Sequence, residues 1–231
     1  MSAGRDPGAV GAIKIAPSLL SADFGALGAA VEGVAGAADW LHLDVMDAHF
    51  VANLTIGPPV VASLRRHSSM FFDCHLMMED PGSYLEDFSK AGADSLTVHV
   101  EVGDTAELLL EIRRLGMRAG LAASPQTGFE SMEEYLGRLD VVLCMTVHPG
   151  FGGQDFMAEM MDKVRSARAA IDSRGLAVDL EVDGGIDEVT ATLAARAGAN
   201  VLVAGSAVFG HERPRSSIEA IRAAAMAAHG G

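Results

Sequence analysis

Short apolar runs alternate with longer amphipathic segments along the whole chain, and this alternation limits the possible folds more than any other feature. Eight apolar runs predict strands, over 13–18, 40–46, 70–77, 94–100, 117–123, 140–147, 176–183 and 200–205. The segments between them predict helices over 23–37, 81–91, 104–115, 155–173 and 187–197, with shorter ones near 58–67 and 129–137. Because no linker rich in Pro or Ser divides this series, the strand–helix units predict one parallel sheet.

The length of the chain favours closure of that sheet. Eight strand–helix units within 231 residues suit a single (β/α)8 barrel of the TIM type, whereas an open, doubly wound sheet normally has fewer strands. The barrel domain is expected to span residues 13–231. Residues 1–12 have no apolar core of signal-peptide length and are expected to form a flexible tail.

Composition excludes several classes of partner. The net charge is −14 and the pI is about 4.8, which argues against nucleic acids and anionic membrane surfaces because both require a basic footprint. The apolar runs fall far short of the roughly 18–20 residues that a membrane-spanning helix needs. Two cysteines, Cys74 and Cys144, are too few to crosslink a chain of this length, so a packing role and a cytoplasmic location are expected.

Three predicted strands carry ionisable side chains where a parallel barrel strand should be apolar. Because side chains alternate along a strand, each strand places its polar residues on one face: His42, Asp44 and Met46; Asp73, His75 and Met77; Glu181 and Asp183. Any one of them alone is most simply a buried residue with a satisfied hydrogen bond. Together they would carry a large desolvation cost, so they indicate a functional site at the C-terminal ends of the strands.

The residue types in this group indicate a metal site. His42, Asp44, His75 and Asp183 offer two nitrogens and two oxygens, a set that suits one divalent ion per subunit such as Zn²⁺, Fe²⁺, Mn²⁺ or Co²⁺. Magnesium fits less well because it prefers oxygen ligands and water.

Glycine-rich turns follow the last three predicted strands, at Gly150-Phe151-Gly152-Gly153, at Gly184-Gly185 and at Gly205-Ser206. Glycine lets backbone N–H groups approach an anion, and in barrels the turns after strands seven and eight often hold a phosphate group. Consecutive turns of this kind predict a phosphate site that needs no cluster of basic side chains.

Several longer motifs resemble those of the ribulose-phosphate 3-epimerase family, and the resemblance covers almost the whole chain. The motifs lie at residues 15–24, 41–58, 73–77, 145–154, 181–185 and 204–206. The resemblance implies a metal-dependent isomerase on a (β/α)8 barrel that binds ribulose phosphate at its C-terminal face. Its expected reaction interconverts D-ribulose 5-phosphate and D-xylulose 5-phosphate by proton transfer at C3 through an enediolate, a step of the pentose phosphate pathway.

The resemblance also assigns roles to residues. It makes Asp44 and Asp183 the acid–base pair, and it makes the same two carboxylates ligands of the metal together with His42 and His75. Expected substrate and phosphate contacts are Ser18, His75, Gly150, Phe151, Gly152, Gly153, Asp183, Gly184, Gly185, Gly205 and Ser206, and expected thioethers beside the reacting carbons are Met46, Met77 and Met145. His99 is expected to pack or to support a ligand. The expected partners are a sugar phosphate and, in a homo-oligomer, further copies of the chain.

Four positions depart from the family pattern. Ala48 stands where the family often has Gly or Asn, and Ala52 stands where it usually has Pro. In the loop after strand five, Ser124 replaces a common Asn or Lys, and Gly128 replaces a usual Pro. They leave open a preference for a six-carbon ketose phosphate such as allulose 6-phosphate. A lyase or decarboxylase would more often place a lysine at a strand end, and the predicted strand ends carry none. A metal-binding scaffold without turnover fits poorly with a carboxylate pair beside three anion-binding turns.

Overall fold

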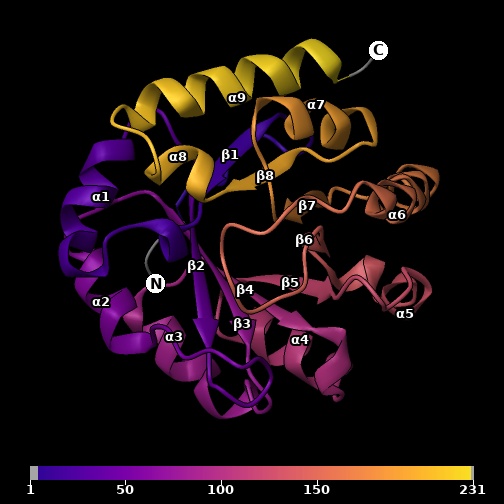
Figure 1. Cartoon of the computed structure of the whole chain (residues 1–231). Helices are drawn as coiled ribbons and strands as arrows, with labels where there is room; N and C mark the ends of the chain where they lie inside the picture. The colour runs from indigo at the N-terminus through magenta and orange to yellow at the C-terminus, as the bar shows by residue number, and fades with distance from the viewer. Residues whose placement is uncertain (1–4, 230–231) are drawn as a thin grey trace.

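A computed structural model describes residues 5–229, which form eight parallel strands arranged as a barrel (Figure 1). The strands are β1 Lys14–Pro17, β2 Trp40–Met46, β3 Phe71–Met77, β4 Ser95–His99, β5 Arg118–Ala123, β6 Val141–Met145, β7 Asp179–Asp183 and β8 Val201–Ala204. Hydrogen-bonded neighbours follow the order β1-β8-β7-β6-β5-β4-β3-β2. Beside β1, Ser18 forms a parallel bridge with His42 of β2, and this contact brings the two ends of the sheet together. The predicted fold class is confirmed.

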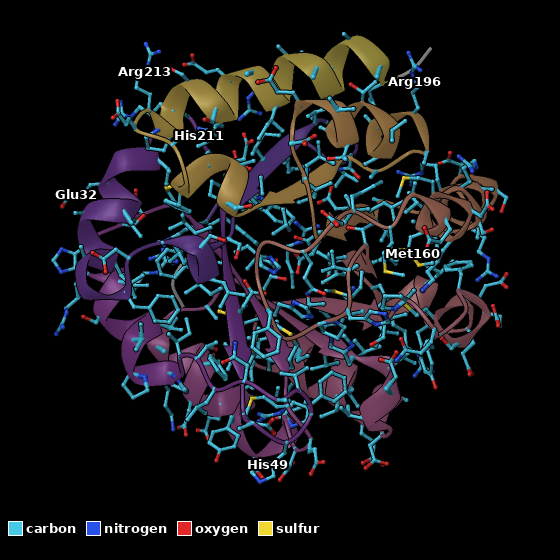
Figure 2. All side chains as sticks on the ribbon, viewed as in Figure 1. Glu32, His49, Met160, Arg196, His211 and Arg213 are labelled. Carbon is cyan, nitrogen blue, oxygen red and sulfur yellow. The ribbon has the colours of Figure 1, made fainter. Side chains whose placement is uncertain are left out.

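Helices surround the barrel and follow its strands (Figure 1). They are α1 Leu27–Val34, α2 Pro58–Arg65, α3 Leu85–Ala91, α4 Thr105–Arg114, α5 Glu130–Glu133, α6 Met161–Ser173, α7 Glu188–Arg196, α8 Ser206–Phe209 and α9 Pro214–Ala228. Short 3-10 turns lie at Leu19–Ser21, Phe24–Ala26, Gly82–Tyr84, Val100–Val102, Leu136–Arg138 and Ala158–Met160. Charged side chains such as Glu32 on α1 and Arg196 on α7 point into solvent (Figure 2). Several helices begin later than their amphipathic patterns suggest, because 3-10 turns precede them.

The two faces of each strand pack into different environments. Outward-facing residues such as Leu41, Leu43 and Val45 belong to the large apolar core between the sheet and the helices. Inside the barrel lies a smaller apolar cluster, formed by Ala16, Trp40, Phe71, Val141, Val201 and Val203. The polar residues of β2, β3 and β7 lie inside the barrel, as period-two alternation predicts.

Residues that precede β1 lie against the N-terminal end of the barrel. The Trp40 indole N–H donates to the carbonyl of Pro7 at 2.9 Å. The Lys14 ammonium donates to Asp179 and to the carbonyl of Ala9, each at 2.7 Å. Residues 1–4 lie outside the described part, and the flexible tail expected over residues 1–12 stays a prediction.

Two expectations from composition concern the described chain as a whole. Over residues 5–229, no helix has both the length and the apolar character that crossing a bilayer requires. Cys74 and Cys144 are free thiols buried in the apolar core. Burial raises the pKa of the Cys144 thiol to about 12, which fits the packing role expected of it.

Candidate active site

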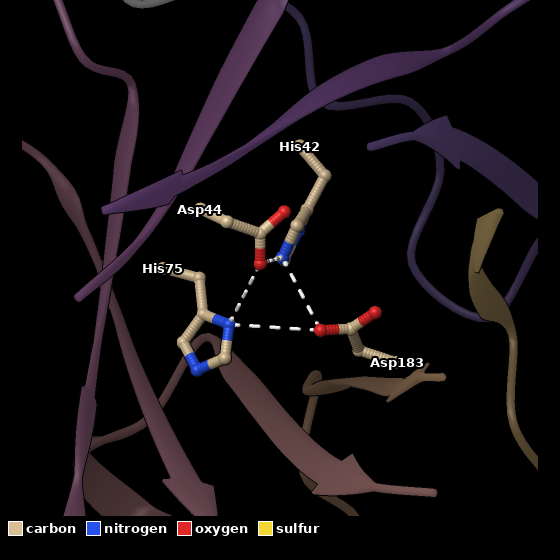
Figure 3. Close-up of side chains that lie close together, drawn as sticks. All are labelled: His42, Asp44, His75 and Asp183. Atoms are coloured by element: carbon tan, nitrogen blue, oxygen red, sulfur yellow. Dashed lines mark ion pairs between the residues drawn. The ribbon is translucent and has the colours of Figure 1, made fainter. Parts of the chain in front are cut away.

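Four side chains converge inside the C-terminal end of the barrel: His42, Asp44, His75 and Asp183 (Figure 3). Asp44 Oδ1 lies 3.5 Å from both His42 Nε2 and His75 Nδ1. Asp183 Oδ2 lies 3.8 Å from His42 Nε2 and 3.7 Å from His75 Nδ1. The structure therefore brings together all four residues that the sequence predicted as metal ligands.

The pairing of strands explains this convergence. In the register between β2 and β3, Asp44 lies beside His75 and His42 lies beside Asp73. Residues 42 and 44 are two apart on one strand, so both point into the barrel. Asp183 ends β7 and reaches the same point from the opposite side of the closed sheet. Its carboxylate thus faces that of Asp44 across the group.

His42 and Asp44 are held by contacts on the side away from the group. The carboxylate of Asp73 lies 2.9 Å from His42 Nδ1, and Glu181 Oε1 lies 3.3 Å from the same atom. A carboxylate accepts a hydrogen bond, so Nδ1 carries a proton, and in a neutral His42 the lone pair of Nε2 faces the group. Ser18 Oγ donates to Asp44 Oδ2 at 2.6 Å, which leaves Oδ1 directed toward the two imidazoles.

Electrostatics within the group favour ionised Asp44. Burial alone would raise the pKa of Asp44, but the charges of His42 and His75 and their hydrogen bonds outweigh burial and lower it. Burial alone would lower the pKa of His42, whereas Asp44, Asp73 and Glu181 raise it well above its usual value. Burial, together with the neighbouring Asp73 charge, raises the pKa of Glu181 to about 8.

The four residues fit a divalent cation. One nitrogen or oxygen from each lies within 4.8 Å of the corresponding atoms of the others. His42 Nε2 and His75 Nδ1 are buried and have no hydrogen-bond partner within the described chain. Unpartnered buried imidazole nitrogens beside two carboxylates form the N2O2 set that borderline first-row ions prefer.

A cavity opens directly above this group at the C-terminal face. Its lining includes Asp44 and Asp183, and also Ser18, Met46, Met77, Met145, Gly150, Phe151, Gly152, Gly153, Gly184, Gly185, Gly205 and Ser206. The three methionine side chains are almost wholly buried, and Phe151 is 58 % exposed at the rim. His75, which was also expected to contact substrate, is fully buried and is not among the lining residues.

At two glycines that line this cavity, a side chain would clash with neighbouring atoms. Gly185 has φ +64°, and a Cβ there would lie 2.6 Å from the backbone nitrogen of Phe156. A Cβ on Gly205 would collide with the Ser21 hydroxyl. Both turns therefore present bare backbone toward the cavity, as a phosphate site requires.

Some residues around the site were not assigned roles from the sequence. Asp73 and Glu181 were placed on the polar strand faces, yet their contact with His42 depends on register across the barrel. Asn53 joins the loops after β2 and β6, because its amide donates to the carbonyl of Gly150 at 2.7 Å. Asn53 lies within the motif at residues 41–58, and this motif is the sequence feature that could have identified it.

The positions that depart from the family pattern lie outside the cavity lining. Ala48 has φ +62°, in the left-handed region that Gly and Asn adopt more readily. Ser124 donates its backbone N–H to Glu101 at 2.8 Å. The departures thus change loops around the site and leave the four converging side chains in place.

Fold and site together define a (β/α)8-barrel protein with a paired-carboxylate centre beneath glycine-rich turns. The profile of the ribulose-phosphate 3 epimerase family matches residues 14–209. Over 224 residues the chain is 50% identical to "Ribulose-phosphate 3-epimerase" of Rhodobacter capsulatus, covering 94% of this chain and 97% of that one. Over 220 residues it is 48% identical to "Ribulose-phosphate 3-epimerase, cytoplasmic isoform" of Oryza sativa subsp. japonica, covering 93% and 95%. The chain belongs to the ribulose-phosphate 3-epimerase family and is an isomerase.

Solved structures at low sequence identity share the fold. The crystal structure of 3-keto-L-gulonate-6-phosphate decarboxylase from Vibrio cholerae superposes with a TM-score of 0.70 at 18% identity, covering 94% of this chain and 98% of that one. This likeness concerns the barrel alone.

Proposed function

We propose that this chain is a metal-dependent 3-epimerase that interconverts D-ribulose 5-phosphate and D-xylulose 5-phosphate. One observation carries the proposal: the carboxylates of Asp44 and Asp183 face each other across a group that also holds two unpartnered imidazole nitrogens. Both carboxylates line the cavity at the C-terminal face.

The two carboxylates supply the proton transfers. Inversion at a carbon beside a ketone requires removal of its proton from one face and delivery of a proton to the other. Asp44 is the base toward one epimer, since its neighbours keep it ionised, and Asp183 delivers the proton from the opposite side. In the reverse direction the two exchange roles. The Ser18 hydroxyl donates to Asp44 Oδ2 and so fixes the orientation of this carboxylate, whose Oδ1 faces the two imidazoles.

His42, Asp44, His75 and Asp183 would hold the divalent ion, with Zn²⁺, Fe²⁺, Mn²⁺ and Co²⁺ as candidates. When bound, the ion supplies positive charge that stabilises the enediolate formed between the two proton transfers. Asp73 accepts the Nδ1 proton of His42 and so presents the Nε2 lone pair of the neutral ring to the site.

The remaining cavity residues bind and shield the substrate. The turns at Gly184-Gly185 and Gly205-Ser206 offer backbone N–H groups to the phosphate, which suits a chain with a net charge of −14. Met46, Met77 and Met145 form an apolar wall that excludes water from the reacting carbons. The proposal places the enzyme in the cytoplasm, in keeping with two buried free thiols. A homo-oligomeric state stays a prediction.

An assay of the purified, metal-loaded protein tests this function. We expect turnover of D-ribulose 5-phosphate to D-xylulose 5-phosphate with a higher kcat/KM than 3-epimerisation of allulose 6-phosphate. A higher kcat/KM for the hexose phosphate would replace the pentose assignment, and absence of epimerisation of either sugar would overturn the proposal.

A substitution at Gly205 tests the phosphate position. Gly205→Asp is expected to raise KM for the sugar phosphate by about 30-fold or more, the equivalent of roughly 2–4 kcal/mol, because it sets a carboxylate against the anion. Gly205→Asn is the matched control, since it adds the same bulk without charge and reports the steric part through Ser21. Equal KM values for the two variants would place the phosphate away from this turn.

A further inference from the structure

A line of hydrogen bonds leads from His75 away from the cavity. His75 Nε2 lies 2.8 Å from Nε2 of His99, the last residue of β4. His99 Nδ1 lies 3.1 Å from Glu101 Oε2, in the 3-10 turn that follows β4. Glu101 Oε1 accepts the backbone N–H of Ser124 at 2.8 Å. Three side chains thus connect the ligand cluster to the loop after β5.

The chemistry of the two ends determines where each proton lies. Glu101 accepts at both oxygens, so the bond to His99 is donated by His99 Nδ1–H. A neutral His99 then has a lone pair on Nε2, and the short contact requires His75 to donate its Nε2–H. When His75 is neutral, its lone pair is therefore left on Nδ1, the atom that lies 3.5 Å from Asp44 and 3.7 Å from Asp183.

Close packing keeps the imidazoles of His75 and His99 from forming hydrogen bonds with other partners. His75 and His99 are both fully buried, and their rings lie side by side with centroids 5.0 Å apart and an interplanar angle of 22°. The ring of Phe50 covers His99 at a centroid distance of 4.6 Å. Burial alone would raise the pKa of Glu101, but its bonds to His99, Thr127 and the Ser124 N–H lower it to about 2. At neutral pH the line of hydrogen bonds therefore ends at the ionised carboxylate of Glu101.

We propose that Glu101 acts through His99 to set the tautomer of His75, so that the Nδ1 lone pair of His75 is available to a metal ion. Glu101 and His99 are positioning residues, and neither touches the substrate. The two histidine ligands are thus oriented by different means. Asp73 accepts directly from His42, whereas His75 is oriented by a carboxylate one imidazole further away. The role toward a metal rests on the proposed function, whereas the tautomer itself does not.

The near-isosteric substitution Glu101→Gln should exchange donor and acceptor in both hydrogen bonds between the side chains of this line. In Glu101→Gln the amide oxygen must face the Ser124 N–H, because that backbone group can only donate. The amide NH2 then faces His99 Nδ1, which becomes the acceptor. His99 donates from Nε2 to His75 Nε2, and the proton of His75 moves to Nδ1, where it blocks metal binding. Glu101→Ala, in contrast, removes the acceptor without imposing a donor, so His99 can keep either tautomer.

The first measurement is metal affinity, by competition of each purified protein with a chelator for Zn²⁺. We expect Glu101→Gln to bind about 10- to 100-fold more weakly than the unaltered chain, and Glu101→Ala to lose less. A packing role alone gives the opposite order, because alanine removes more contacts than glutamine. Glu101→Ala binding as weakly as Glu101→Gln, or more weakly, would overturn the proposal.

The second measurement reads the protons directly, by nitrogen NMR of the metal-free protein labelled with ¹⁵N at histidine, at a pH high enough that His75 is neutral. We expect a protonated Nε2 on His75 and an unprotonated Nε2 on His99 in the unaltered chain, and the reverse in Glu101→Gln. The same pattern in both proteins would overturn the proposal even if Zn²⁺ affinity differs. Because this experiment needs no substrate, failure of the epimerase assignment would leave its result unaffected.

Discussion

Asp44→Asn and Asp183→Asn are each expected to reduce kcat for epimerisation by about 10³-fold or more, because each removes one of the two groups that move a proton. The amide matches the carboxylate in shape, so the barrel should fold as before. Asp44 lies beside His42 and His75 and accepts from Ser18, and Asp183 is 15 % exposed in its side chain. The measurement is steady-state turnover, with circular dichroism to verify folding.

A surface carboxylate provides the matched control for this pair. Asp162 on α6 has a side chain that is 85 % exposed and is paired with Arg165 in the same helix. Asp162→Asn is expected to leave kcat unchanged. Retention of near-normal turnover by either Asp44→Asn or Asp183→Asn would contradict the two-carboxylate mechanism.

Deuterium incorporation separates the two carboxylates. In deuterated water the unaltered enzyme should place deuterium at C3 of the product in both directions, because each incoming proton comes from a group that exchanges with solvent. A variant that lacks one carboxylate should retain at most slow exchange at C3 of one epimer, without inversion. The epimer that still exchanges identifies the surviving base. Substantial return of the original hydrogen in the unaltered enzyme would favour a single base.

Much of this site was predictable because it depends on local periodicity. Alternation along β2 and β3 places His42, Asp44 and His75 inside any closed parallel barrel, and the Gly-Gly after Asp183 marks the end of β7. Closure then brings strands that lie far apart in the sequence to one axis. These steps need no knowledge of side-chain contacts, and the structure confirms the convergence that they predict.

The contacts behind the ligands could not be predicted in the same way. His42 meets Glu181 because of the relative height of β2 and β7 across the barrel, which no local pattern encodes. Glu101 meets His99 because a 3-10 turn directs the chain back on itself after β4. A short bond between two imidazoles is likewise a tertiary property, and it makes His99, which was expected to pack or to support a ligand, the link between His75 and Glu101.

Two helices differ from their predicted boundaries. The predicted helix over 155–173 begins at Met161, because Met157 N–H bonds back to the carbonyl of Thr146 and residues 158–160 form a 3-10 turn. The short helix predicted near 129–137 consists of four residues and a following 3-10 turn. Amphipathic patterns report which face is buried and do not identify the residue at which regular hydrogen bonding begins.

Removal of the metal is expected to abolish most of the activity, since positive charge beside a developing enediolate is worth several kcal/mol, or on the order of 10³-fold in rate. Dialysis against a chelator should lower kcat accordingly, and addition of Zn²⁺, Mn²⁺, Co²⁺ or Fe²⁺ should restore it to different extents. Loss of a tightly bound ion should also lower the Tm, because an ion that binds only the folded chain stabilises it by mass action.

The histidine variants localise that effect. His42→Ala and His75→Ala should each lower metal content and kcat together, because their unpartnered nitrogens point at the same two carboxylates. His211, an exposed residue between α8 and α9 (Figure 2), gives the matched control, and His211→Ala should keep both metal and turnover. Elemental analysis and turnover on the same samples make the comparison. Full metal content in both His42→Ala and His75→Ala, with activity lost, would assign the imidazoles to the reaction itself and the ion to other residues.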